Sequence, residues 1–147
     1  MAVIDGLTDC TSHYVAVRAR DEFDLEDDNG ITILAKTLDE TAPAFAGISA
    51  VQTSGGGAFL EWTPGNDGCV NGAELAYNIY VSTTSGGQDF STPTVTNTSS
   101  AFNWSMSGLD LLTEYFFVVR AVDPSGNEDD NDVELSGTTS GVADEQA

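Results

Sequence analysis

The amino-acid sequence contains the same motif twice, 102 positions apart. Without a gap, 12 of the 32 positions from 6 to 37 are identical to positions 108 to 139. The longest shared runs are Val17-Arg18-Ala19 with Val119-Arg120-Ala121, and Glu26-Asp27-Asp28-Asn29 with Glu128-Asp129-Asp130-Asn131. A fixed period within one chain indicates an array of similar structural units. The 147-residue chain is therefore predicted to hold one complete unit of roughly 100 residues, preceded by the last third of another.

The local pattern of both copies predicts an all-β chain. Apolar and β-branched residues alternate, Gly, Ser, Thr and Asn interrupt them often, and no stretch has a helical period. In the partial copy the expected strands are 12–20 and 30–37, with six acidic residues in the nine positions between them. In the complete copy seven strands are expected, at about 44–51, 58–63, 75–82, 94–97, 101–106, 113–122 and 132–139. Short strands at this spacing are typical of a sandwich of two antiparallel sheets.

The predicted domain organisation has four parts. Residues 1–38 form the last two strands of a preceding domain, 39–43 a linker, 44–139 a complete domain and 140–147 a flexible tail. Two strands alone are marginally stable in water, so we expect a partner to cover the apolar face of the partial copy. The chain is then either a slice of a longer tandem array, which we favour, or is completed by a neighbouring chain through strand complementation.

Charge excludes several classes of partner. The chain has 24 acidic and 4 basic residues, a formal net charge of −20, which disfavours contact with nucleic acid or an anionic membrane surface. Three of the basic residues lie in the partial copy, so Arg120 is the single one of the complete copy. No apolar run approaches the ~18 residues that a membrane span needs, so no membrane insertion is expected.

The sequence offers little catalytic chemistry. It contains one histidine, His13, and neither a serine in a nucleophile elbow nor a glycine loop that would bind phosphate. No carboxylate pair lies on a recognisable cleft scaffold. We therefore predict that the chain is not an enzyme and requires no cofactor, with His13 in a structural role.

Five segments of the complete copy follow a known family pattern. They are Thr41-Ala42-Pro43, LEWTP with Trp62, AYNIYVS with Tyr77 and Tyr80, Leu109 with Thr113-Glu114-Tyr115, and VVRAVDPSGNE. In this order and spacing they resemble a fibronectin type III domain of the bacterial or archaeal extracellular tandem-repeat type. The resemblance implies an immunoglobulin-like sandwich in which Trp62 packs in the core and Tyr115 forms a tyrosine corner. In the partial copy His13 stands at the position of Tyr115, and an imidazole cannot make the same bond.

Acidic residues gather at one expected pole of the complete domain. Similar domains place the turn between the last two strands beside the loop after the second strand and beside the incoming linker. The candidate ligands at this pole are Asp39, Asp67, Asp123, Asn127, Glu128, Asp129 and Asp130. Ca²⁺ takes six to eight oxygen ligands from carboxylates and carbonyls, so a Ca²⁺ site at this pole is one interpretation. The interpretation that we favour is a solvated acidic rim, because the spacing does not match an EF-hand loop.

The resemblance also brings the two cysteines to one junction. It places Cys69 at the pole that faces the preceding domain, and Cys10 at the pole of that domain that faces forward. Leu112 occupies the position equivalent to Cys10, so each copy supplies one thiol, as an interdomain bridge requires. We expect a Cys10–Cys69 disulfide in an oxidising compartment. The alternatives are two free thiols, or Cys10 paired within the missing part of its own domain.

These features predict a structural protein of the cell surface or extracellular space. The expected function is a stiff spacer or filament segment of tandem fibronectin type III-like domains, with neighbouring copies or another chain as partners. The alternative is a binding module of an adhesin or secreted carbohydrate-active enzyme, which would contact protein or carbohydrate. Such a module needs exposed aromatic rings, and the candidates are Tyr80, Phe90 and Phe116, since most other aromatic residues, Phe102 included, are predicted to lie in the core.

Overall fold

The computed structural model describes residues 3–70, 74–98 and 101–141. It divides into two compact units, an N-terminal unit of residues 1–40 and a C-terminal unit of residues 41–147. The predicted linker, residues 39–43, contains the boundary between them. Within the described part of the chain, no helix is long and apolar enough to cross a lipid bilayer.

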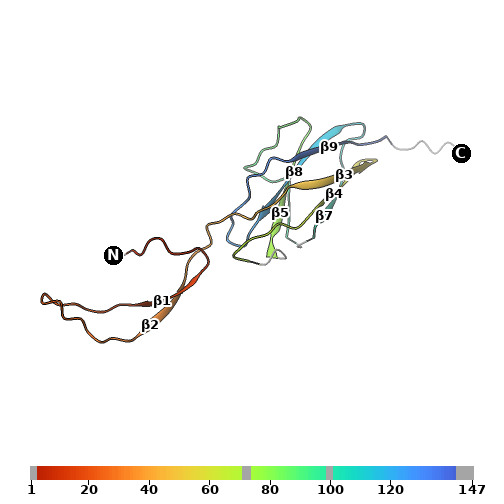
Figure 1. Ribbon diagram of the computed structural model, residues 1–147. Helices are drawn as coiled ribbons and strands as arrows, with labels where there is room; N and C mark the ends of the chain where they lie inside the picture. The colour runs from red at the N-terminus through yellow and green to blue at the C-terminus, as the bar shows by residue number, and fades with distance from the viewer. Residues whose placement is uncertain (1–2, 71–73, 99–100, 142–147) are drawn as a thin grey trace. The chain divides into compact units, whose positions relative to one another are not determined.

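The N-terminal unit is an antiparallel hairpin. Strand β1 (Ser12–Ala16) pairs with β2 (Thr32–Lys36), and His13 lies opposite Ala35 (Figure 1). The pairing ends before the acidic loop because Asp27 and Asn29 bind the backbone there, in place of a continued strand ladder.

The C-terminal unit consists of two antiparallel sheets (Figure 1). The first has the order β3-β4-β7, from strands β3 (Ile48–Ser54), β4 (Gly57–Trp62) and β7 (Asn103–Ser107). The second has the order β6-β5-β8-β9, from β5 (Ala76–Ser82), β6 (Val95–Asn97), β8 (Glu114–Val122) and β9 (Glu134–Thr138). The predicted all-β class with antiparallel sheets is confirmed.

The core of the C-terminal unit lies between these sheets. Along β4 every second residue is buried, as expected for a strand with one face inward. The same alternation runs along β5 and β8, except that Tyr80 and Val118 on the other face are buried too. The core residues are Ile48, Ala58, Leu60, Trp62, Leu75, Tyr77, Ile79, Tyr115, Phe117, Val119 and Ala121. The Trp62 ring lies with its centroid 5.2 Å from that of Tyr77. The predicted core position of Trp62 is confirmed.

Two aromatic residues do not lie where the sequence analysis placed them. Phe102 was expected in the core, but it comes just before β7 and is 40% exposed. Tyr80 was expected at the surface, but it is only 2% exposed. Its ring faces outward on β5 and is covered by Phe90, with ring centroids 5.1 Å apart. The prediction failed because the irregular segment that follows β5 folds back over the outer face of the strand at this point.

Tyr115 forms the corner bond that the family resemblance implied. Its hydroxyl accepts a hydrogen bond from the backbone N–H of Asp110 at 3.0 Å. His13 occupies the equivalent position of the N-terminal unit, and its buried Nε2 has no hydrogen-bond partner within the described part of the chain. The hairpin therefore lacks this link between the strand and the loop that precedes it.

The internal repeat extends to backbone conformation and register. Strands β1 and β2 begin 102 positions before β8 and β9 respectively, and His13 faces Ala35 as Tyr115 faces Gly137. The glycines that precede the paired strands, Gly6 and Gly108, both have positive φ, at 72° and 80°. Cys10 and Leu112 also share a positive φ, at 51° and 55°, which is uncommon for residues with a side chain.

The apolar face of the hairpin is open. A shallow depression on it is lined by Val15, Val17, Asn29, Ile31, Ile33 and Ala35. Val17 and Ile33 are strongly exposed. The residue equivalent to Val17 in the C-terminal unit is Val119, which is fully buried. One repeated sequence pattern thus forms a core in one unit and a solvent-facing surface in the other.

Candidate functional site

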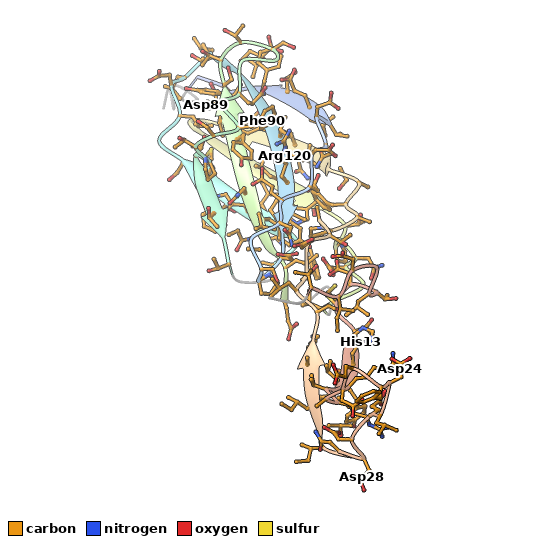
Figure 2. All side chains as sticks on the ribbon, turned by 90° about the vertical axis from the view of Figure 1, so that its left-hand side faces the viewer. His13, Asp24, Asp28, Asp89, Phe90 and Arg120 are labelled. Atoms are coloured by element: carbon orange, nitrogen blue, oxygen red, sulfur yellow. The ribbon has the colours of Figure 1, made fainter. Side chains whose placement is uncertain are left out.

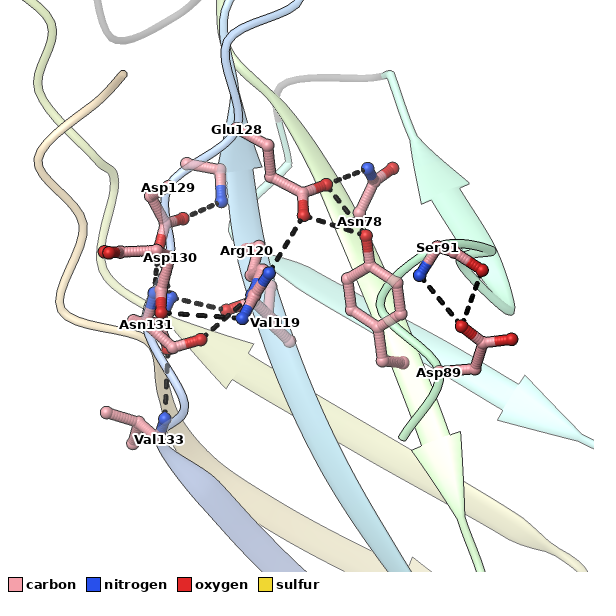
Figure 3. A network of polar contacts seen from close by, with 12 residues as sticks. Asn78, Asp89, Ser91, Val119, Arg120, Glu128, Asp129, Asp130, Asn131 and Val133 are labelled. Carbon is pink, nitrogen blue, oxygen red and sulfur yellow. Dashed lines mark hydrogen bonds and ion pairs between the residues drawn. The ribbon is translucent and has the colours of Figure 1, made fainter. Parts of the chain in front are cut away.

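The loop between β8 and β9 is stabilised by the carboxylate of Glu128 (Figure 3). This carboxylate accepts hydrogen bonds from the Tyr80 hydroxyl at 2.8 Å and from the Asn78 amide, and it forms an ion pair with Arg120 at 3.4 Å. The Arg120 and Glu128 side chains are only 14% and 22% exposed. Burial, together with the adjacent Glu128 carboxylate, raises the pKa of Tyr80 to about 12.

Arg120 connects the loop to a second segment of the chain. Its Nε donates to the backbone oxygen of Asn131 at 2.9 Å. Its guanidinium lies 3.7 Å from the centroid of the Phe90 ring, and Figure 2 shows the two side chains beside each other. A guanidinium stacked on an aromatic face gains a cation–π attraction. Arg120 is therefore held by carboxylate, backbone and aromatic contacts at once.

Asp129 also acts on its own loop. It accepts hydrogen bonds from the backbone N–H groups of Ala121 and of Asn131, and from the Asn131 side chain. Burial raises its pKa, and the hydrogen bonds from Asn131 and Ala121 partly oppose that effect. Asp130 has an exposed side chain, and only its backbone oxygen contacts Arg120, at 3.5 Å. Of the predicted metal ligands, Glu128 and Asp129 thus fix the loop conformation.

Asp67 and Asp123 come together from different loops of the C-terminal unit. Asp67 lies between β4 and β5, and Asp123 follows the last residue of β8. Both are buried, and each offers a carboxylate oxygen within 4.8 Å of the other. Asn127 donates two hydrogen bonds to Asp123, from its backbone N–H at 2.9 Å and from its side-chain amide at 2.7 Å. Asp39 belongs to the N-terminal unit, and the predicted seven-residue ligand set stays a prediction.

The acidic loop of the N-terminal unit repeats these bonds with greater exposure. Arg18 pairs with Glu26 at 3.3 Å and its Nε donates to the backbone oxygen of Asn29 at 3.0 Å. The Ala19 N–H donates to Asp27 at 2.9 Å, as Ala121 donates to Asp129. Because the side chains of this ion pair are about half exposed, solvent weakens its contribution to stability.

The sequence analysis did not identify Phe90 and Tyr80 as partners of Arg120 and Glu128. The one available signal was that the complete copy, residues 44–139, holds a single basic residue among twelve acidic ones. An isolated cation in such a chain is expected to be held by several groups. Its aromatic partner could not be identified, because Phe90 comes from an irregular segment between β5 and β6.

The cysteines are oxidised. Cys10 and Cys69 are both disulfide-bonded, and neither is a free thiol. The predicted disulfide state is therefore confirmed. The sequence contains no third cysteine.

Comparison with known proteins shows which solved structures have a similar fold. No protein-family model matches the chain, and no curated protein matches it in sequence. Solved structures do. A human fibronectin type III domain, from fibronectin type III domain containing protein 3, is similar over 73% of this chain and 92% of that domain, with 17% identity and a TM-score of 0.53. The FN1–FN3 domains of chicken CNTN1 are similar over 91% of this chain and 44% of that chain, with 14% identity and a TM-score of 0.56.

A bacterial enzyme contains a similar region. The β-1,2-glucanase of Parabacteroides distasonis matches 76% of this chain, with 18% identity and a TM-score of 0.54, but the match spans only 15% of the glucanase chain. These similarities agree with the tyrosine corner and with the order of the strands in the two sheets, and together they define the fold class. The protein has a fibronectin type III-like fold.

Proposed function

We propose that this chain is a structural extracellular module, a stiff spacer segment of a filament or surface protein built from tandem fibronectin type III-like domains. The observation that carries the proposal is the repeat itself. Two consecutive copies share register, loop hydrogen bonds and positive-φ positions at a period of 102 residues. Repeat arrays act as extended scaffolds because each unit contacts its neighbours.

The disulfide supplies the stiffness in this proposal. One cysteine lies in each unit and both are disulfide-bonded, so a Cys10–Cys69 bond would link consecutive units covalently. It would close a loop of about sixty residues, which contributes roughly 4 kcal/mol in the chain-entropy account. Disulfides persist in oxidising surroundings, which supports an extracellular location.

Peptide mapping with and without reductant tests this role. We expect one Cys10–Cys69 peptide in the untreated protein, and two alkylated cysteine peptides only after reduction. Spin labels placed on exposed Ser105 and Leu34 should give a narrow distance distribution that broadens on reduction, because the linker alone then joins the units. The Cys10→Ser/Cys69→Ser double variant is the control for reductant effects. Two freely alkylated thiols in the untreated protein, or an unchanged distribution after reduction, would contradict the stiff junction.

The open face of the hairpin supports a neighbouring like domain as partner. Its exposed residues Val17 and Ile33 correspond to Val119 and Leu135, which pack in the core of the C-terminal unit. We propose that a domain of the same type covers this face in the assembled protein. Sedimentation equilibrium is the test. A chain that associates as its concentration rises supports a neighbouring chain, whereas a strict monomer leaves only a domain of the same polypeptide.

The alternative function is a binding module of an adhesin or a secreted carbohydrate-active enzyme. The fold similarity to a region of a β-1,2-glucanase favours it. Against it, Tyr80 is buried and the Phe90 ring, although 37% exposed, is stacked with Arg120, so two of the three candidate rings are already engaged within the domain. Free thiols in the mapping experiment would favour this alternative, because an independent module needs no fixed junction.

A further inference from the structure

We propose that the C-terminal unit binds a divalent cation of the Ca²⁺ class at the carboxylates of Asp67 and Asp123. The proposal does not depend on the spacer role. Asp67 comes from the loop after β4 and Asp123 from the end of β8. Their carboxylate oxygens lie within 4.8 Å of each other, a separation that one ion can bridge at the usual Ca²⁺–oxygen distance of about 2.4 Å.

One oxygen of the buried Asp67 carboxylate lacks a hydrogen-bond partner among the described residues. The side chain is only 7% exposed, and its Oδ1 accepts a hydrogen bond from the Cys69 N–H at 2.6 Å. Its Oδ2 is buried and has no hydrogen-bond partner among the residues that the structure describes. Buried carboxylate oxygens are normally satisfied, because removing one from water without a partner is costly. A bound cation would satisfy this oxygen.

Asp123 presents its carboxylate in a fixed orientation beside it. It is 4% exposed, and Asn127 donates one hydrogen bond to each of its oxygens. Two buried carboxylates this close repel each other unless a positive group lies between them. A carboxylate oxygen has more than one lone pair, so these bonds from Asn127 leave room for coordination to a metal.

No basic side chain of the C-terminal unit can supply that positive charge. Arg120 is the single Lys or Arg residue between positions 41 and 147. It is paired with Glu128 at 3.4 Å and stacked on Phe90 at 3.7 Å. A cation from solution is the remaining compensating group that leaves both carboxylates ionised.

The available ligands select a hard cation. The C-terminal unit contains no histidine, and Cys69 is disulfide-bonded and so offers no thiolate. The remaining donors are carboxylate and carbonyl oxygens with water, a set that suits Ca²⁺ or Mg²⁺ rather than Zn²⁺ or Cu²⁺. Ca²⁺ fits better, because it tolerates irregular geometry in loops.

The internal repeat provides a natural contrast. Asp21 is the equivalent of Asp123 in the N-terminal unit, but it is exposed and accepts hydrogen bonds from the backbone of Phe23 and Leu25 at 2.8 Å and 3.0 Å. The corresponding carboxylate is thus satisfied by its own loop. The proposed site is specific to the C-terminal unit.

Calorimetric titration of the full chain with CaCl₂, after treatment with EDTA, tests the proposal. We expect one Ca²⁺ per chain and a higher melting temperature with Ca²⁺ than with EDTA. Asp67→Asn and Asp123→Asn should each weaken binding by about tenfold or more. Asparagine keeps an acceptor for the Cys69 or Asn127 N–H, so the loops should stay folded, which circular dichroism checks. Asp21→Asn and Asp130→Asn are the matched controls and should leave the affinity within about twofold.

Three outcomes would overturn the site. The first is no binding heat and no thermal stabilisation by Ca²⁺ in the unaltered chain. The second is weak binding that all four variants reduce equally, which would indicate a diffuse ion atmosphere around the acidic surface. The third is a melting temperature that does not change with Ca²⁺ but rises when the pH is lowered, with no such rise in the Asp67→Asn variant. That result would show that the two carboxylates share a proton.

Discussion

Replacing Trp62 with alanine is expected to lower the free energy of unfolding of the C-terminal unit by about 4 kcal/mol. Trp62 is 4% exposed and ends β4, where its ring packs against Tyr77 from the opposite sheet. Its indole N–H has no hydrogen-bond partner among residues 3–70, 74–98 and 101–141, so the loss consists of apolar packing and the cavity left behind. Urea unfolding followed by circular dichroism measures the change, since the substitution removes one of the two tryptophans.

Two variants control this prediction. Trp62→Phe keeps an aromatic ring and loses no hydrogen bond, so we expect a cost of about 1.5 kcal/mol, well below that of alanine. Phe102→Ala removes a ring that is 40% exposed, and it should cost about 1 kcal/mol or less. Equal losses for Trp62→Ala and Phe102→Ala would mean that the core does not centre on Trp62.

The second large effect is expected for Arg120→Ala, with a loss of about 3 kcal/mol of unfolding free energy. The substitution leaves Glu128 largely buried without its cation, removes the hydrogen bond to Asn131 and uncovers Phe90. The remaining carboxylate still accepts from Tyr80 and Asn78, but its charge is no longer compensated. Urea unfolding followed by tryptophan fluorescence reports the C-terminal unit, because Trp62 and Trp104 both lie there.

A double-mutant cycle with Glu128→Gln separates the ion pair from the packing of the arginine. Glutamine keeps an acceptor for Tyr80 and removes the uncompensated charge. The double variant should therefore lose less than the sum of the single variants, by about 1 kcal/mol or more. Arg18 is the equivalent of Arg120 in the exposed loop of the N-terminal unit. The Arg18→Ala variant should therefore leave the urea unfolding transition of the C-terminal unit unchanged. Strict additivity in the cycle would contradict a buried, coupled pair.

The alternation of apolar and polar residues along each strand explains why most strands were predicted correctly from the sequence. Six of the seven strands expected in the complete copy agree with the structure to within about two residues at each end, because alternation marks every inward-facing position. The first strand begins later than expected, at Ile48 instead of Ala44. Gly47 has a φ of 83°, a left-handed conformation that interrupts the extended chain before β3. A glycine in an apolar run does not reveal such a turn by itself.

Contacts between segments that lie far apart in the sequence were not predictable in the same way. Phe90 covers the ring of Tyr80, and the guanidinium of Arg120 stacks on the Phe90 ring. Phe90 lies in an irregular loop, where no sequence periodicity indicates its position. The acidic residues after β8 looked alike in the sequence, yet their environments differ. Glu128 pairs with Arg120, whereas Asp123 meets Asp67, which lies 56 positions earlier in the chain.

Residue order predicted the repeat, and the two-residue period of its strands predicted the all-β class, because both are local properties. The core position of Trp62 and the tyrosine corner at Tyr115 were implied by the resemblance to fibronectin type III domains. Which carboxylates are hydrogen-bonded, and which lack a partner among the described residues, depends on tertiary packing. Packing sets the burial of Asp67 and the distance between its carboxylate and that of Asp123, because those depend on how loops from separate strands meet.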